Sequence, residues 1–155
     1  MEITLINYST SDAITAIQYA LQNCDEGEFQ FNKKKFDVES LEWFGTLISF
    51  TWPRSYKEIL QKFNGFSIGN THVYSFIESI EILLTFREKF KNEQYWPIGT
   101  DGCGNYYVLN TAKLENEECP VFFLEADSDY SASNESFSSF ASYVVLSLNF
   151  DLQHQ

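Results

Sequence analysis

The stretch that decides the fold is WPIGTDGCGNYYVL, which spans Trp96–Leu109. It predicts a strand over Tyr95–Ile98, then an acidic turn punctuated by glycines, then an aromatic strand over Asn105–Asn110. Glycine adopts positive φ without a Cβ clash, so the glycines are typical of a tight turn between paired strands. The stretch therefore predicts two antiparallel strands.

The sequence on either side predicts helices and further short strands. The predicted strands are residues 2–8, Phe29–Phe31, Thr71–Phe76 and Pro120–Leu124, the last in a central position of the sheet. The predicted helices begin at Ser11 and Asp37 as N-caps, run within Trp52–Gly65, extend from Ile80 to Phe90, and close the chain from Phe137 to Leu148. Strands and helices do not alternate strictly, and hairpin-length connections predominate after Gly69. This order predicts an α+β fold with a mainly antiparallel sheet.

Length and composition predict one domain over residues 1–155. A chain of 155 residues with 44% hydrophobic and 17% aromatic residues can bury a substantial core. The cysteines Cys24, Cys103 and Cys119 are odd in number and far apart, which favours a reducing compartment over a disulfide framework. The first residues have no basic segment followed by a long apolar one, so we expect no signal peptide and a cytoplasmic protein.

The charge is strongly negative and uneven along the chain. The net charge is −12, and residues 101–155 hold nine acidic residues against one base, Lys113, which is a net −8. Such a surface repels nucleic acid and anionic lipid, so we expect neither as a partner. It attracts basic proteins and accelerates encounter with them. The same charge is also explained by solubility alone.

The motifs that carry chemistry are incomplete. Gly99, Gly102 and Gly104 are not followed by the lysine, hydroxyl residue and helix of a phosphate-binding loop, and Asp101 would repel a phosphate. His72 and His154 lie in no zinc-binding or nucleophile motif. The sequence therefore predicts no cofactor, no metal site and no catalytic residue. A hydrolase with paired carboxylates remains an alternative, because the acids are numerous and sequence does not reveal their pairing.

Three segments, in order, resemble the SUKH superfamily, whose founding member regulates yeast cell-wall synthesis. The segments are Trp52–Gly65, with its proline, tyrosine, apolar helix and Asn-Gly; Pro97–Tyr107, with its Ile-Gly and acidic glycine turn; and Pro120–Phe123, followed by an acidic loop and Ser136–Phe140. The resemblance covers residues 37–148. Residues 1–35 match no part of it and are interpreted as an N-terminal elaboration.

The resemblance implies a fold and a class of function. It implies a twisted antiparallel sheet flanked by helices. It also implies that bacterial members are commonly immunity proteins, which neutralise the toxin domain of a polymorphic secretion system, often a nuclease. Such a protein needs no catalytic residue of its own. The alternative from the same superfamily is a regulatory, protein-binding module of the cell-wall-regulator kind.

We therefore expect a non-enzymatic, cytoplasmic immunity protein that binds a basic toxin domain through an acidic surface. Its oligomeric state stays open. The contacts that we predict come from the acidic last third of the chain, with one aromatic anchor. They are Asp101, Tyr106, Glu117, Glu118, Asp127 and Asp129.

Overall fold

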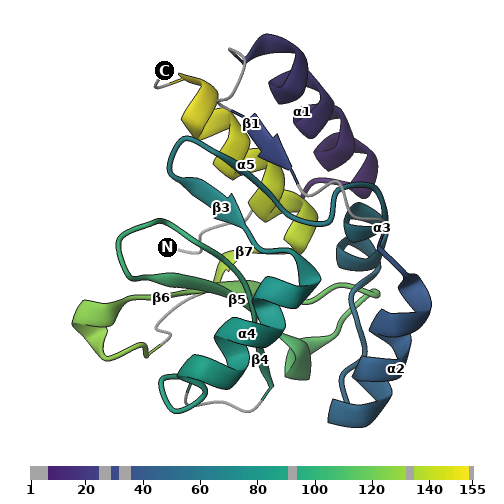
Figure 1. Ribbon diagram of the computed structural model, residues 1–155, viewed down its shortest axis with the longest axis vertical. Coiled ribbons are helices and arrows are strands. Elements are labelled where there is room, and N and C mark those ends of the chain that lie inside the picture. Colours follow the sequence, from purple (N-terminus) through teal and green to yellow (C-terminus); the bar gives the residue numbers. More distant parts are fainter. Residues whose placement is uncertain (1–6, 25–28, 32–35, 91–93, 132–134, 154–155) are drawn as a thin grey trace.

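The protein folds around one antiparallel sheet (Figure 1). The structure, a computed structural model, describes residues 7–24, 29–31, 36–90, 94–131 and 135–153. Within these residues seven strands pair in chain order. They are β1 (Phe29–Phe31), β2 (Phe66–Ile68), β3 (Thr71–Val73), β4 (Tyr95–Thr100), β5 (Tyr106–Asn110), β6 (Val121–Leu124) and β7 (Glu135–Phe137). Most of the strand predicted over residues 2–8 lies outside the described residues.

Five helices flank the sheet and confirm the α+β prediction. They are α1 (Thr10–Asn23), α2 (Val38–Ile48), α3 (Arg54–Lys62), α4 (Phe76–Phe86) and α5 (Phe140–Gln153), with short 3₁₀ turns η1 (Thr111–Lys113) and η2 (Ala126–Ser128). Helices α1 and α5 pack side by side, and α4 crosses beside β4 (Figure 1). Helix α1 packs into the same hydrophobic core as the rest of the chain, because its Ala13, Ile17 and Ala20 are fully buried.

Trp96 lies at the centre of the core. Its ring is fully buried and packs against rings from α2, α4 and the segment before α3, and its indole N–H donates to the Tyr56 hydroxyl at 2.8 Å. The neighbouring Trp52 donates its own N–H to the carbonyl of Leu41 at 2.7 Å. Both buried indoles thus have the partner that a polar atom needs away from water. The cluster ties α2 and α3 to β4.

The hairpin β4–β5 has the predicted turn. Gly102 and Gly104 have φ of 81° and 85°, the left-handed region that glycine adopts without strain. A bulge between Pro97 and Gly99 shifts the register. A Cβ on Gly99 would meet the Tyr143 hydroxyl and would lie 2.7 Å from the carbonyl oxygen of His72. Glycine at this position therefore permits α5 to approach β4.

Three predicted boundaries are wrong. The first two are wrong because the helix is capped at another residue than the sequence pattern indicated. Helix α1 begins two residues earlier than predicted, since Ser9 and Asp12 form a capping box and Ser11 lies inside the helix. The strand predicted over Thr71–Phe76 ends at Val73, because Ser75 and Glu78 form a second capping box that starts α4. Helix α4 ends at Phe86, earlier than the predicted Phe90.

Two further expectations about the last third are wrong. Phe137 ends β7 and does not belong to the final helix, which begins at Phe140. Strand β6 is next to the β7 edge of the sheet, not central. Its apolar run is explained by burial on both faces, because Val121 and Phe122 alternate in direction and both are buried.

Candidate functional site

The fold separates the six predicted contact residues into two groups. Asp101, Tyr106, Asp127 and Asp129 lie at the end of the sheet where β4 turns into β5 and where β6 leaves toward β7. Glu117 and Glu118 lie in the β5–β6 connection, at the other end of the strands and beside α3 (Figure 1). The six residues therefore do not form one surface.

The β4–β5 turn holds Asp101 in a fixed orientation. The Asp101 Oδ1 accepts from the backbone N–H of Cys103 at 2.8 Å, and its Oδ2 accepts from the side-chain amide of Asn105 at 2.8 Å. The Thr100 hydroxyl donates to the Asn105 carbonyl at 2.7 Å. An aspartate that bonds the backbone two residues ahead is a typical turn former. The carboxylate is thus oriented before any partner arrives.

Asn105 joins this turn to the loop after β6. Its side-chain oxygen accepts from the backbone N–H of Ala126 at 2.9 Å, at the start of η2. The exposed Asp127 lies within η2, and Asp129 follows it with a φ of 54°. We call the group of Asp101, Glu125, Asp127 and Asp129 the acidic end. Two loops, tied by one asparagine, thus present four carboxylates at one end of the sheet.

Tyr106 supports the acidic end from inside. Its side chain is only 9% exposed, and its ring packs against Phe86, Phe90 and Tyr130. Burial raises the pKa of its hydroxyl. The ammonium of Lys89 lies 5.1 Å from the centre of the Tyr130 ring, so one cation borders the acidic end. Little of Tyr106 is accessible to a partner in this arrangement.

The side chain of Glu118 acts within the fold, whereas that of Glu117 is 74% exposed and lies 3.7 Å from Arg54. The Glu118 carboxylate accepts from the backbone N–H of Ser55 at 2.8 Å and from its hydroxyl at 2.6 Å. Helix α3 begins after Pro53, which has no side-chain acceptor, so Glu118 supplies the missing cap from a distant part of the chain. Burial raises the pKa of Glu118, although the hydrogen bonds from Ser55 oppose that effect. The Glu117 carbonyl accepts from the N–H of Arg54 at 2.8 Å.

The histidine in the described part of the chain is also engaged. His72 Nε2 lies 2.7 Å from the Glu78 carboxylate, which in turn accepts from the backbone N–H of Ser75 at 3.0 Å. Burial alone would raise the pKa of Glu78, but the hydrogen bonds from His72 and Ser75 outweigh it and lower the pKa. His154 lies outside the described residues. Among those that are described, no three His, Cys, Asp or Glu side chains are placed to hold a metal ion.

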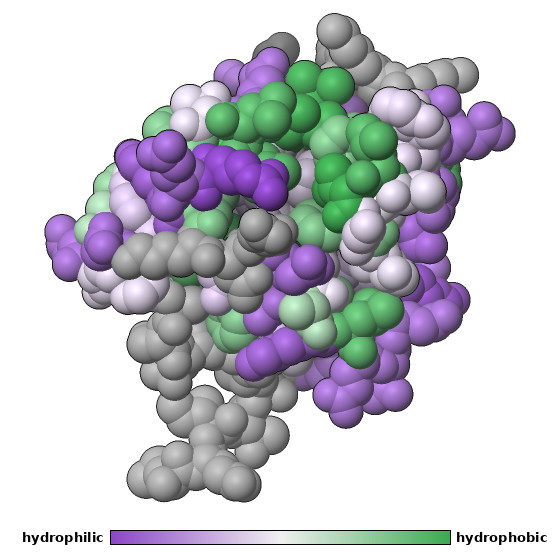
Figure 2. Space-filling model, turned by 90° about the horizontal axis from the view of Figure 1, so that it is seen from below, coloured by the Kyte–Doolittle hydropathy of each residue, from purple (hydrophilic) through white to green (hydrophobic). Residues whose placement is uncertain are grey.

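Exposed side chains of the opposite chemistry lie on two of the helices. Helices α2 and α4 expose four large apolar side chains, which are Trp43, Leu47, Ile77 and Leu84. Figure 2 shows apolar side chains gathered in the upper half of the face seen from below. In the described residues, no helix is long and apolar enough to cross a membrane. These exposed apolar side chains are a second candidate contact for a protein partner.

Sequence reasoning missed the residues that shape this region. Asn105 was assigned only to a strand, although an asparagine four residues after an aspartate in a turn is a signal for such a bond. The cavity beside Asp101, formed by Tyr107, Phe137 and Tyr143, was also missed. It joins β5, β7 and α5, and no local pattern predicts a contact between elements so far apart.

Comparison with protein families gives one match. The model of the SMI1 / KNR4 family (SUKH-1) matches residues 35–144. The match includes all three segments that carry the resemblance in the sequence. A search of curated proteins finds no match.

Proposed function

This chain belongs to the SMI1 / KNR4 family (SUKH-1), and from that premise we propose that it is an immunity protein that binds and neutralises a basic toxin domain. The family supports an immunity or regulatory module that binds a protein partner. We further propose that it acts in the cytoplasm without catalysis of its own. The three cysteines form no disulfide, which suits a reducing compartment.

The observation that carries this proposal is the acidic end. Asp127 and Asp129 are exposed, Asp101 is oriented by two hydrogen bonds, and one asparagine ties their loops together. Exposed carboxylates on an ordered scaffold attract a basic partner and fix its orientation. A nuclease domain suits this surface, because a site built for phosphate is itself basic. The proposed contact surface is therefore the acidic end, without Glu117 and Glu118.

The test is rescue by co-expression, followed by titration. A toxin domain encoded beside this gene is expressed in a host with and without the protein, and binding is then measured at low and high ionic strength. We expect rescue and tight, salt-sensitive binding. Failure of rescue, together with recovery of a constitutive partner by pull-down, would replace the immunity role with the regulatory one.

A matched pair of double variants tests the placement of the surface. Asp127→Asn with Asp129→Asn removes two charges from the acidic end, and Glu115→Gln with Glu117→Gln removes two from the opposite end. We expect the first pair to lower the association rate about tenfold at low salt and to flatten its salt dependence. We expect the second pair to change the rate by less than about twofold. Equal effects, or loss of binding only in Trp43→Ser or Leu84→Ser, would contradict the placement.

A further inference from the structure

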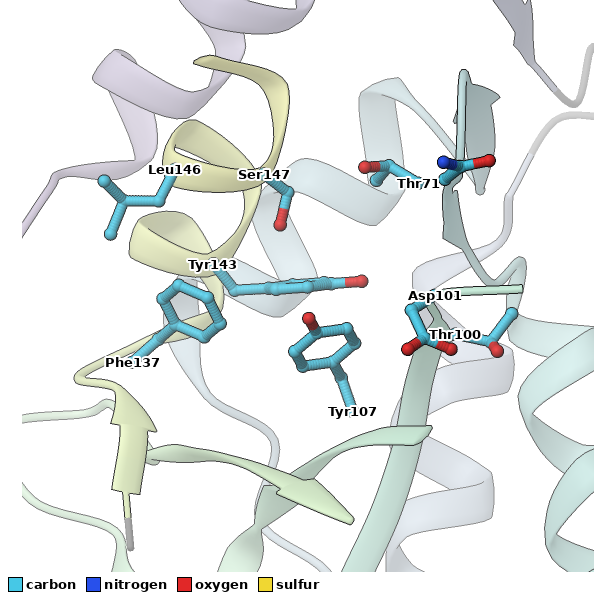
Figure 3. Close-up of a pocket in the computed structure, with 9 residues that line it drawn as sticks. Thr71, Thr100, Asp101, Tyr107, Phe137, Tyr143, Leu146 and Ser147 are labelled. Carbon is cyan, nitrogen blue, oxygen red and sulfur yellow. The ribbon is translucent and has the colours of Figure 1, made fainter. Parts of the chain in front are cut away.

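A cavity of about 350 Å³ opens beside the acidic end and shares Asp101 with it (Figure 3). Aromatic side chains from β5, β7 and α5 form one wall, and short polar side chains with one carboxylate form the other. The lining includes Thr71, Thr100, Asp101, Tyr107, Phe137 and Tyr143. The volume falls in the range of small-ligand sites and suits a single side chain from a partner.

The aromatic wall is rigid. The ring centres of Tyr107 and Tyr143 are 4.8 Å apart, and Phe137 lies 5.5 Å from Tyr143. Tyr143 is only 1% exposed, and Gly99 leaves the space that its hydroxyl occupies. Tyr143 therefore supports the wall from behind, and the half-buried rings of Tyr107 and Phe137 present a fixed π surface to the cavity. Such a surface attracts a cation without loss of side-chain freedom.

The polar wall offers a carboxylate acceptor in a fixed position. Each oxygen of Asp101 accepts one hydrogen bond from within the turn, and a carboxylate oxygen has a second lone pair. The described residues that line the cavity include no lysine and no arginine. An apolar occupant would leave the carboxylate facing it without a counter-charge, which is unfavourable. The cavity is therefore complementary to a cation on an apolar stem.

We propose that this cavity receives an arginine side chain of the partner protein, with the guanidinium stacked on the aromatic wall and paired with Asp101. Arginine suits both walls, because its planar guanidinium stacks on rings and bonds a carboxylate with two parallel N–H groups. Lysine offers a compact, strongly hydrated charge and matches the flat wall less well. This inference rests on the proposed function, since it names how a basic partner is recognised.

The isolated full chain tests the cavity without any toxin. The probe is N-acetyl-arginine methylamide, titrated while the NMR signals of the tyrosine and phenylalanine rings are followed, with the neutral isostere N-acetyl-citrulline methylamide as control. We expect the arginine probe to shift the Tyr107 and Phe137 signals with a Kd on the order of 1–10 mM. The citrulline probe is expected to bind at least about tenfold more weakly. Equal shifts from both probes would overturn the proposal.

Three variants separate the cavity from the general negative charge. Asp101→Asn keeps an oxygen for the Cys103 N–H but loses the acceptor for the Asn105 amide, and it is expected to weaken arginine binding about tenfold. Glu88→Gln removes the same charge from an exposed residue outside the cavity and is expected to change binding by less than about twofold. Tyr107→Phe keeps the ring and should retain binding. Equal loss in Asp101→Asn and Glu88→Gln would show diffuse attraction only and would overturn the proposal.

The two proposals fail in different ways. Rescue from the toxin, without arginine binding and with unchanged toxin affinity in Asp101→Asn, would overturn the cavity and leave the immunity role. Arginine binding that depends on Asp101, without rescue, would support the cavity and would assign its basic partner to another class of protein. Rescue together with at least about tenfold weaker toxin binding by Asp101→Asn would support both.

Discussion

At one end of the sheet, the Glu118 carboxylate accepts two hydrogen bonds from Ser55 and caps α3, whereas at the other end Asp127 and Asp129 are exposed. Both ends carry carboxylates on connections between neighbouring strands. The β5–β6 connection meets a helix that has no cap of its own, and the loop after β6 is tied to the β4–β5 turn through Asn105. The same residue type therefore stabilises the fold at one end and is exposed to solvent at the other.

The difference shows that neighbours, not charge, decide what an acidic residue does. A half-buried carboxylate retains its charge at the cost of desolvation, which hydrogen bonds must offset. For Glu118 the effect of burial outweighs that of the hydrogen bonds from Ser55, since the pKa of Glu118 is raised. The count of nine acids in the last third thus overstates the surface that can meet a partner. Three predictions test this contrast.

The largest effect is expected from Glu118→Ala. Ser55 is only 1% exposed, and this change leaves its backbone N–H and its hydroxyl without their acceptor. We expect the free energy of unfolding to fall by about 2 kcal/mol, measured by urea denaturation. The matched control is Glu117→Ala. The Glu117 side chain is 74% exposed and lies 3.7 Å from Arg54. This control should lose no more than about 0.5 kcal/mol, and similar losses in both variants would remove the contrast.

A smaller effect is expected from Asn105→Ala at the acidic end. The change removes the hydrogen bond to Asp101 and the one from the Ala126 N–H. We expect a loss of about 1 kcal/mol in the free energy of unfolding, because the site is partly exposed. Hydrogen exchange gives the sharper readout, since the Ala126 amide should lose protection while the Val108 amide in β5 retains it. Unchanged exchange at Ala126 would show that the two loops are ordered independently.

The fold was largely predictable, because its signals are local. The glycines after Thr100 predicted the turn with positive φ, Asp37 was correctly predicted as an N-cap, and Asn64-Gly65 marked the end of α3. The errors arose where two local signals compete. Phe76 continues the apolar pattern of β3, but the capping box of Ser75 and Glu78 starts a helix there.

The site was less predictable, because it depends on contacts between distant segments. Glu118 and Ser55 are 63 positions apart, and Asn105 and Ala126 are 21 apart. Tyr107 meets Tyr143 only because Gly99 lets α5 approach the sheet. Composition gives the charge of a region, but the division of that charge between fold and surface follows from tertiary packing.

The smallest effect concerns pH and compares two carboxylates that both hold the start of a helix. The pKa of Glu78 is lowered in the folded protein, so its contribution to stability is present above its unfolded value of 4.5 and is lost as the pH falls through its lower folded value. The pKa of Glu118 is raised, so the charged form is unfavourable to folding, and that unfavourable contribution disappears as the pH falls toward 4.5. We therefore compare the denaturant midpoint of the unchanged protein with that of each Gln variant between about pH 3 and 6. The difference in midpoint should change in opposite directions for Glu78 and Glu118. As the pH falls, the unchanged protein should lose stability relative to Glu78→Gln. It should gain stability relative to Glu118→Gln. Parallel curves would mean that neither helix start depends on the charge of its carboxylate, and that the hydrogen bonds alone hold both.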